Sequence, residues 1–220
     1  MVRHLRRAAV FGFSLWSLLA LASDQAGSPT VSFTLDFPGA NPSHYEINVT
    51  KDGHGSYRSN GQLSRDAEPA DPVSLEFSLS DKVRQQIFDL AKHAQYFSGN
   101  VDSGRKNIAN TGAKTLSYND GKHSTQATYN YSLMPAVEQL TDVFQGLSTT
   151  LEFGRRLTYF HKYQKLALDD DLKRMQDLEQ SNMLGDLQAI APVLESIGKD
   201  PSVMNMTRAR AWRLLGPPKS

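Results

Sequence analysis

Alternating apolar and polar residues predict β-strands in the first half of the chain. Residues 31–37 alternate strictly, and because successive side chains of a strand point to opposite faces, this pattern is typical of a strand with one buried face. Asp52-Gly53 and Asp120-Gly121 predict tight hairpin turns, since glycine accepts the positive φ that such turns need. The strands expected are 31–37, 45–49, a return strand around Tyr57, 73–77, 114–118 and 125–131.

A helix is expected after each group of strands. Ser80 is a good N-cap and is followed by Asp81, whose carboxylate is favoured by the helix dipole, while Pro135 suits the first turn of the second helix. Apolar residues at helical spacing mark the two buried faces: Val83, Ile87, Leu90, Ala91 and Ala94, then Val137, Leu140, Phe144 and Leu147. The pattern therefore predicts two hairpin–helix units.

From Leu151 onward the spacing is helical and no strand is indicated. Gly154 is a weak point of the first stretch, and Pro192 should kink or restart a helix. Asp200-Pro201 predicts the start of a last helix, through Leu215. We therefore predict an α+β fold, with an antiparallel sheet from two hairpin–helix units in residues 23–148 and an all-helical C-terminal region in residues 149–220.

Residues 1–22 predict a signal peptide. A basic start is followed by an apolar run, Ala8–Ala22, which is shorter than the ~20 residues that a helix needs to cross a bilayer. Ala20 and Ala22 supply the small-x-small pattern of a cleavage site, so Ser23 is the expected mature N-terminus. We expect an exported protein, periplasmic or secreted, with no transmembrane segment after signal removal. An uncleaved N-terminal anchor is the alternative.

Composition and net charge exclude several classes of function. The chain has no cysteine, which excludes disulfides, iron–sulfur clusters, Cys-type zinc sites and thiol nucleophiles. Loss of residues 1–22 removes three arginines and no acid, so the formal charge changes from +1 to −2. A chain so close to neutral has no overall field that would hold nucleic acid, and we expect no nucleic-acid partner.

No known catalytic or metal-binding motif is present in the sequence. The histidines do not form an H-x-x-x-H pair, and although His44, His54 and His123 lie by the hairpins, scattered surface imidazoles are the favoured interpretation. The segment Gly112–Thr115 is not a phosphate loop, because Asn107 stands where the first glycine is required and Ala113 separates Gly112 from Lys114. Neither a G-x-S-x-G elbow nor calcium-loop spacing occurs. The sequence therefore designates no catalytic, cofactor-binding or metal residue, and no cofactor.

Three charged groups are favoured as solvated helix faces. Asp169–Asp171 is followed by Lys173 and Arg174 at the spacing of local ion pairs. The basic groups are Arg155, Arg156, Lys162 and Lys165, and further on Arg208, Arg210 and Arg213. A surface for an acidic partner, or for a polyanionic envelope component, is the alternative for the basic groups.

The order of elements resembles that of small exported bacterial domains of unknown function. The resemblance covers residues 33–147 and rests on structural motifs: Tyr45–Tyr57 around the first Asp-Gly turn, a helix ending in Tyr96-Phe97, and Thr115–Tyr129 around the second turn. This chain lacks the cysteine pair that some of these domains carry near the first strand. The resemblance implies a fold and no catalytic residues.

Two hypotheses of function follow. The first is a non-catalytic exported binding or interaction protein, because the helical region has more apolar surface than a small sheet covers; these helices would contact a protein partner or a second copy of the chain. The second is a hydrolytic enzyme that uses Asp, Glu or His side chains of the hairpins and the polar loop Ser98–Thr111, since long polar loops often carry function. The lack of a catalytic motif favours the first.

Overall fold

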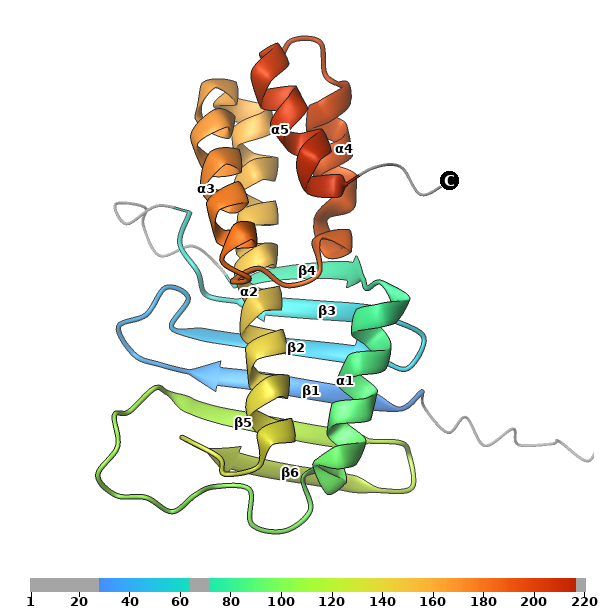
Figure 1. The fold of residues 1–220 in the computed structure, drawn as a ribbon, viewed down its shortest axis with the longest axis vertical. Helices are drawn as coiled ribbons and strands as arrows, with labels where there is room; N and C mark the ends of the chain where they lie inside the picture. The colour runs from blue at the N-terminus through green and yellow to red at the C-terminus, as the bar shows by residue number, and fades with distance from the viewer. Residues whose placement is uncertain (1–27, 64–71, 217–220) are drawn as a thin grey trace, which may run out of the picture.

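A computed structural model describes residues 28–63 and 72–216 of the chain. The segment that predicts a signal peptide, with its cleavage residues Ala20, Ala22 and Ser23, lies outside the described residues. The model confirms the α+β class, with a six-stranded antiparallel sheet followed by a helical C-terminal region (Figure 1).

The sheet has the strand order β4-β3-β2-β1-β5-β6, and every neighbouring pair is antiparallel. The second hairpin therefore joins the free edge of the first strand. Both Asp-Gly turns form as expected, with Gly53 and Gly121 at φ +92° and +83°. The strands are β1 Thr30–Asp36, β2 His44–Thr50, β3 His54–Ser59, β4 Val73–Ser78, β5 Ala113–Asn119 and β6 Ser124–Tyr129.

The two faces of the sheet differ in polarity, as the alternating sequence requires. One face carries the buried core residues Phe33, Ile47, Tyr57 and Leu116. Both α1 and the first half of α2 cover this face (Figure 1). The opposite face presents hydroxyl, amide and charged side chains, exemplified by the hydrogen bond from Ser32 Oγ to Asn48 Oδ1. This second face is consequently a polar surface.

The helices that cover the sheet begin where the sequence predicts. Helix α1 spans Asp81–His93, and the Ser80 side chain accepts a hydrogen bond from the Val83 N–H. Helix α2 spans Pro135–Tyr163, with proline in its first turn. It continues without interruption through Gly154 and across the predicted boundary between residues 148 and 149. One helix therefore belongs to both halves of the molecule.

A left-handed turn follows α1. Gln95, Tyr96 and Phe97 have φ of 52°, 52° and 63°, a region that costs roughly 1–2 kcal/mol per residue outside glycine. The turn is held by tertiary contacts, because Phe97 is buried and the Tyr96 ring lies 4.3 Å from that of Tyr118.

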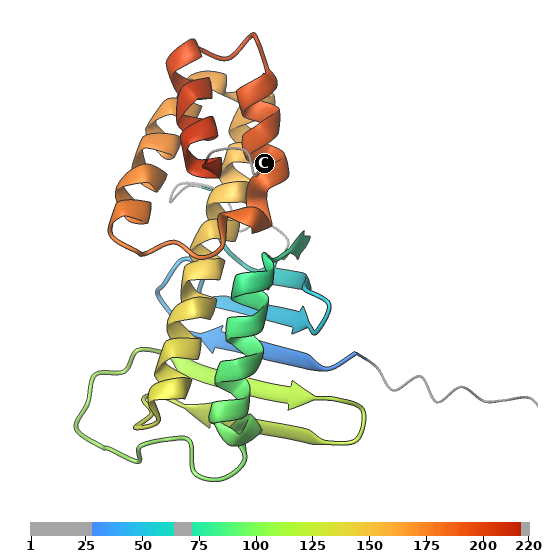
Figure 2. The same ribbon diagram turned by 45° about the vertical axis from the view of Figure 1, so that its right-hand side comes forward.

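The C-terminal helices stand beyond the β4 edge of the sheet and form a bundle with the second half of α2 (Figures 1 and 2). They are α3 Leu168–Gln180, α4 Ala191–Lys199 and α5 Asn205–Leu215. Their apolar stripes bury one another, with Leu172, Met175, Leu194 and Ile197 fully enclosed. Most of the apolar surface that the sequence predicts for this region is thus buried within the bundle.

Two features near the helix starts test local sequence signals. Pro192 lies in the first turn of α4, directly after a short 3₁₀ turn, so the expected restart is confirmed. The prediction that the last helix starts at Asp200-Pro201 is wrong, because α5 begins at Asn205 with Met204 as its N-cap. The Asp200 carboxylate instead contacts His161 and Lys165. Asp200 and Pro201 belong to the turn between α4 and α5.

The loop before α4 joins the bundle to the sheet layer at close range. A Cβ atom on Gly185 would lie 2.5 Å from the backbone nitrogen of Leu147, so only glycine fits against α2 here. The Gly185 N–H donates to Thr150 Oγ1 at 2.9 Å, and the Asp186 carboxylate accepts from the backbone N–H of Ser80 at the start of α1. These bonds fix the bundle to both covering helices.

Interhelical ion pairs correct the prediction of solvated charged faces. Asp169 on α3 pairs with Arg210 on α5, and Asp171 pairs with Arg156 on α2, at 3.0 and 2.9 Å. All four side chains are at most a fifth exposed. Asp169, Asp171 and part of both basic groups therefore connect helices, whereas Asp170 is exposed as predicted.

None of the described helices is long and apolar enough to cross a membrane.

Candidate functional site

The polar loop 98–112 does not assemble the catalytic group proposed in the enzyme hypothesis. Its one acid, Asp102, accepts hydrogen bonds from the backbone N–H groups of Gly104 and Asn130 at 2.6 and 2.9 Å. These bonds stabilise the ionised form and lower the pKa of Asp102. The carboxylate thus anchors the loop to the end of β6.

Lys114 is an unexpected buried cation beneath this loop. It is 5% exposed and shares the inward face of β5 with Leu116 and Tyr118. Its Nζ donates to Thr111 Oγ1 at 2.7 Å and to the backbone oxygen of Asn130 at 2.8 Å. Burial lowers the pKa of Lys114, and among the described residues no carboxylate forms an ion pair with it. Its bonds tie the loop to the sheet.

The acidic residues of the two hairpins, Asp52 and Asp120, stabilise the turns in which they lie. Asp52 accepts hydrogen bonds from the Thr50 hydroxyl and the His54 N–H, and Asp120 accepts from the N–H groups of Lys122 and His123. The backbone bonds lower the pKa of Asp120 to about 2. Both carboxylates are therefore charged turn-stabilising groups rather than proton acceptors near neutral pH.

The three hairpin histidines do not meet. His44 lies opposite Asp36 at one end of the sheet, whereas β3 begins with His54 at the other end. His123 precedes β6, four strand spacings from β3, or roughly 19 Å at about 4.8 Å per strand. Among residues 28–63 and 72–216, no group of three or more His, Asp or Glu side chains is placed to hold a metal ion.

A buried polar network joins the sheet to α2. Glu152 Oε1 accepts hydrogen bonds from the hydroxyls of Tyr57 and Ser59 at 2.9 and 2.5 Å, and Oε2 accepts two from Arg155 at 2.7 and 3.1 Å. Burial, then the nearby Glu152 charge, raises the pKa of Tyr57. The carboxylate is 8% exposed and each oxygen is satisfied, so the network is a structural link without a free base.

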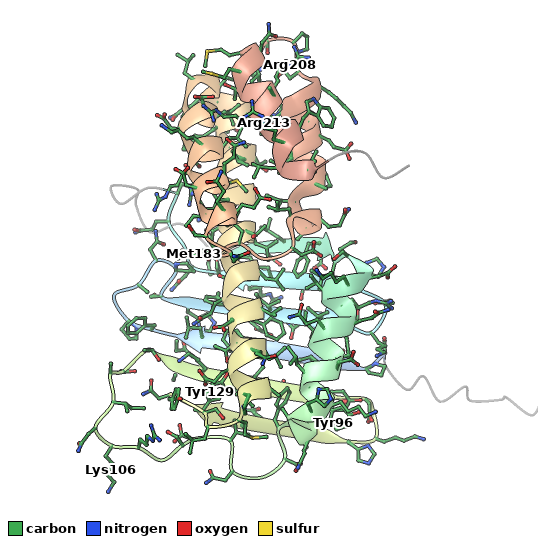
Figure 3. All side chains as sticks on the ribbon, viewed as in Figure 1. Tyr96, Lys106, Tyr129, Met183, Arg208 and Arg213 are labelled. Atoms are coloured by element: carbon green, nitrogen blue, oxygen red, sulfur yellow. The ribbon has the colours of Figure 1, made fainter. Side chains whose placement is uncertain are left out.

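One groove lies where the loop 182–186 meets α1 and α2. It has a volume of about 700 Å³ and is lined by Gln86, Asp142 and Asn182 among others, with Met183, which is labelled in Figure 3, also in its lining. Asp186, which also lines it, is held by backbone N–H groups. The acids and amides share the lining of this groove with apolar side chains such as Val83, Val143 and Leu184.

A second groove, of about 630 Å³, runs between the last turns of α2 and the length of α4, from Pro192 in its first turn to Asp200 after its end. His161 Nε2 lies 2.9 Å from Asp200 Oδ2, and Lys165 Nζ donates to the same oxygen at 2.7 Å. The Lys165 hydrogen bond is the largest of the effects that lower the pKa of Asp200. Ser196 lines the groove, but no hydrogen bond joins it to His161 among the described residues, so the geometry is that of an ion cluster and not of an activated hydroxyl.

The far end of the helical bundle exposes large apolar side chains. We call residues 162–167 and 200–208 the bundle tip; they comprise the end of α2, the connection to α3, the α4–α5 connection and the first turn of α5. The Lys165 Nζ joins these two segments through Asp200 and Ser202. The exposed apolar residues of the tip are Tyr163 (61%), Leu166 (80%), Met204 (47%) and Met206 (56%).

The sequence contained partial signals for these sites. Lys114 stands at an inward position of an alternating strand, which marks it as buried. Glu152, His161 and Asp200 acquire their partners only through contacts distant in sequence. No protein-family model matches this sequence, and a comparison with curated proteins finds no match.

Proposed function

We propose that this chain is an exported, non-catalytic binding protein that contacts its partner through the bundle tip. The observation that carries the proposal is the concentration of four exposed large apolar side chains at one end of the helical bundle. The other exposed large apolar side chains of the bundle, Met183 and Trp212, lie singly, in the loop after α3 and in the second half of α5. Exposing such groups costs free energy, and patches of this kind on a monomer often serve binding.

The bonding of the polar side chains supports a role without catalysis. The carboxylates of Asp102, Asp120 and Asp200 each accept several hydrogen bonds from neighbouring groups. A carboxylate used in this way is held ionised and positioned, and it is a poor proton shuttle near neutral pH. The same side chains therefore contribute to the fold.

Export is proposed from the sequence of residues 1–22. A basic start, an apolar run and the Ala20–Ala22 pattern support it. Intact mass of the product isolated from the producing cell tests this part of the proposal: a chain that begins at Ser23 supports it, and a cytosolic chain that begins at Met1 contradicts it.

Site-specific photo-crosslinking in the producing cell tests binding by the tip. A photoreactive amino acid replaces Leu166 in one variant and Gln126, an exposed position on the polar sheet face, in the control. We expect an adduct of defined mass from position 166, identified by mass spectrometry, and none from position 126. A protein, a lipid or a second copy as the adduct supports the proposal. Equal labelling at both positions, or none at 166, overturns it.

A further inference from the structure

We propose that the partner of the bundle tip is the surface of an anionic lipid bilayer. This inference rests on the proposed function, because it names the chemistry of what the tip binds. It draws on three properties of the tip: its apolar side chains, the cations beside them, and the groove that leads away from them.

The apolar side chains are of the kind that enters a membrane interface. Tyrosine has an apolar ring and a polar hydroxyl, and it favours the headgroup level, while leucine and methionine enter the acyl boundary. Leu166 is the most exposed large apolar residue described, at 80%. It lies in the short turn between α2 and α3, where a side chain can be immersed without unfolding a helix.

Cations accompany these apolar side chains. Lys162 is exposed, and its Nζ lies 5.0 Å from the ring centre of Tyr163. Arg208 lies at the end of the bundle, where it donates to the backbone oxygen of Gly198 (Figure 3). In the described structure neither cation forms an ion pair. Lys162 is exposed, whereas Arg208 is half-buried and also donates from Nη1 to Asn205 Oδ1, so Lys162 is the cation most open to a lipid phosphate and Arg208 adds its positive charge beside it.

The acids near the tip are mostly neutralised. Asp169 is paired with Arg210, and Asp200 is shared by Lys165 and His161. Asp170, in the first turn of α3, is exposed. The outward charge of the tip is therefore positive, which complements an anionic surface and not a neutral one.

The groove between α2 and α4 suits a lipid headgroup. Lys162, Ser196 and the apolar Val193 line it, and so do Lys165 and Asp200, which are bound to each other. The exposed Lys162 ammonium and the Ser196 hydroxyl are therefore the donors left for a phosphate. Ammonium and hydroxyl groups are the donors that a phosphate oxygen accepts from. A phosphate at this place would lie beside the apolar side chains of the tip, as it does at the boundary of a bilayer.

A second copy of the chain fits this surface less well. Four side chains exposed to this extent present on the order of 400 Å², below the roughly 800 Å² per partner of a stable protein interface. Tip-to-tip contact would also bring Lys162 and Arg208 of one copy close to the same cations of the other. A bilayer avoids both problems, since only the tip has to enter it and its phosphates face the cations.

Vesicle flotation tests the proposal with the chain as it is isolated from the producing cell. The vesicles are phosphatidylcholine alone, or phosphatidylcholine with phosphatidylglycerol. We expect binding to the anionic vesicles that is on the order of tenfold or more stronger than to the neutral ones, and that weakens with added salt. Equal binding to both vesicles, or no binding to either, overturns the proposal.

Two pairs of matched variants assign the binding to the tip. Leu166→Ser should lower binding about tenfold. Leu133 is 59% exposed and lies just before the N-terminus of α2, at the other end of that helix from the tip, so Leu133→Ser should leave binding unchanged. Lys162→Glu should lower binding to anionic vesicles by on the order of tenfold, whereas Lys92→Glu on α1 should have much less effect. Each variant carries the same N-terminus, so a retained anchor would affect all of them equally.

The outcomes separate this inference from the proposed function. If the tip variants bind vesicles as the unmodified chain does, the lipid proposal is wrong. If light scattering shows a dimer that Leu166→Ser dissociates, and vesicles are not bound, the partner is a second copy and the proposed function stands. If inorganic phosphate shifts the amide signals of the groove and vesicles are not bound, the site takes a free anion and the lipid proposal is wrong.

Discussion

The hydroxyl of Tyr57, in the third strand, donates a hydrogen bond of 2.9 Å to the Glu152 carboxylate in the middle of α2, 95 residues further along the chain. Arg155, one turn later, pairs with the other oxygen of the same carboxylate at 2.7 Å. Both charged side chains are about nine-tenths buried. This network lies where α2 leaves the sheet and enters the bundle, so it fixes the helix at the point shared by both halves.

Replacing Glu152 should strongly destabilise the protein. Glu152→Ala leaves the buried Arg155 charge and two hydroxyls without their acceptor, and we expect a loss of about 3–5 kcal/mol in the free energy of unfolding. Urea unfolding measures it. The double variant Glu152→Leu/Arg155→Met removes both charges and should lose less than the single variant. A single-variant loss below about 1 kcal/mol would contradict the assigned role.

Replacing glutamine by glycine should have opposite effects on stability in the left-handed turn after α1 and inside α1 itself. Gln95 is exposed and has φ of 52°, so Gln95→Gly should stabilise the chain by about 1 kcal/mol because glycine adopts this conformation without strain. The same change at Gln85, exposed inside α1, should destabilise by about 1 kcal/mol. Thermal unfolding of both variants measures the difference, and a loss of stability from Gln95→Gly would refute strain at this turn.

Local signals account for much of the fold, and contacts distant in sequence account for the rest. Strand alternation and the Ser80 cap depend on neighbours within a few residues, and these elements form as predicted. Asp200 has the local appearance of a helix cap, but its carboxylate is bound by Lys165, 35 residues earlier, and the helix starts later. Asp169 and Asp171 likewise pair with other helices, which local spacing does not reveal.

Asp200 should give the bundle an acid-sensitive contribution to stability. Hydrogen bonds from Lys165, then Ser202 and His161, lower its pKa below the ordinary 3.8. A lowered carboxyl pKa contributes stability that is complete above the unfolded value and is lost as pH falls through the folded value. The melting temperature of Asp200→Asn should therefore lie below that of the unmodified chain at pH 6, with the gap closing below pH 3.8.

Asp170→Asn is the matched control for this measurement, because it removes the same formal charge from an exposed position on α3. Its melting temperature should follow that of the unmodified chain much more closely at pH 6. A gap for Asp200→Asn that stays constant from pH 6 to pH 2 would show that the carboxylate contributes through its shape and not its charge.

Lys114 should control the order of the loop 98–112. Its Nζ donates to Thr111 and to the backbone of Asn130, and these bonds hold the end of the loop against β6. Lys114→Met keeps the apolar stem buried and removes the donors, so the Asn130 oxygen loses a partner. We expect faster trypsin cleavage after Arg105 and Lys106, of which Lys106 lies at the outer margin of the loop (Figure 3). Lys122→Met, at the exposed β5–β6 turn, removes a cation without touching the loop and should leave the cleavage rate unchanged. Equal cleavage rates in both variants would mean that Asp102, through its bonds to Gly104 and Asn130, is sufficient to hold the loop.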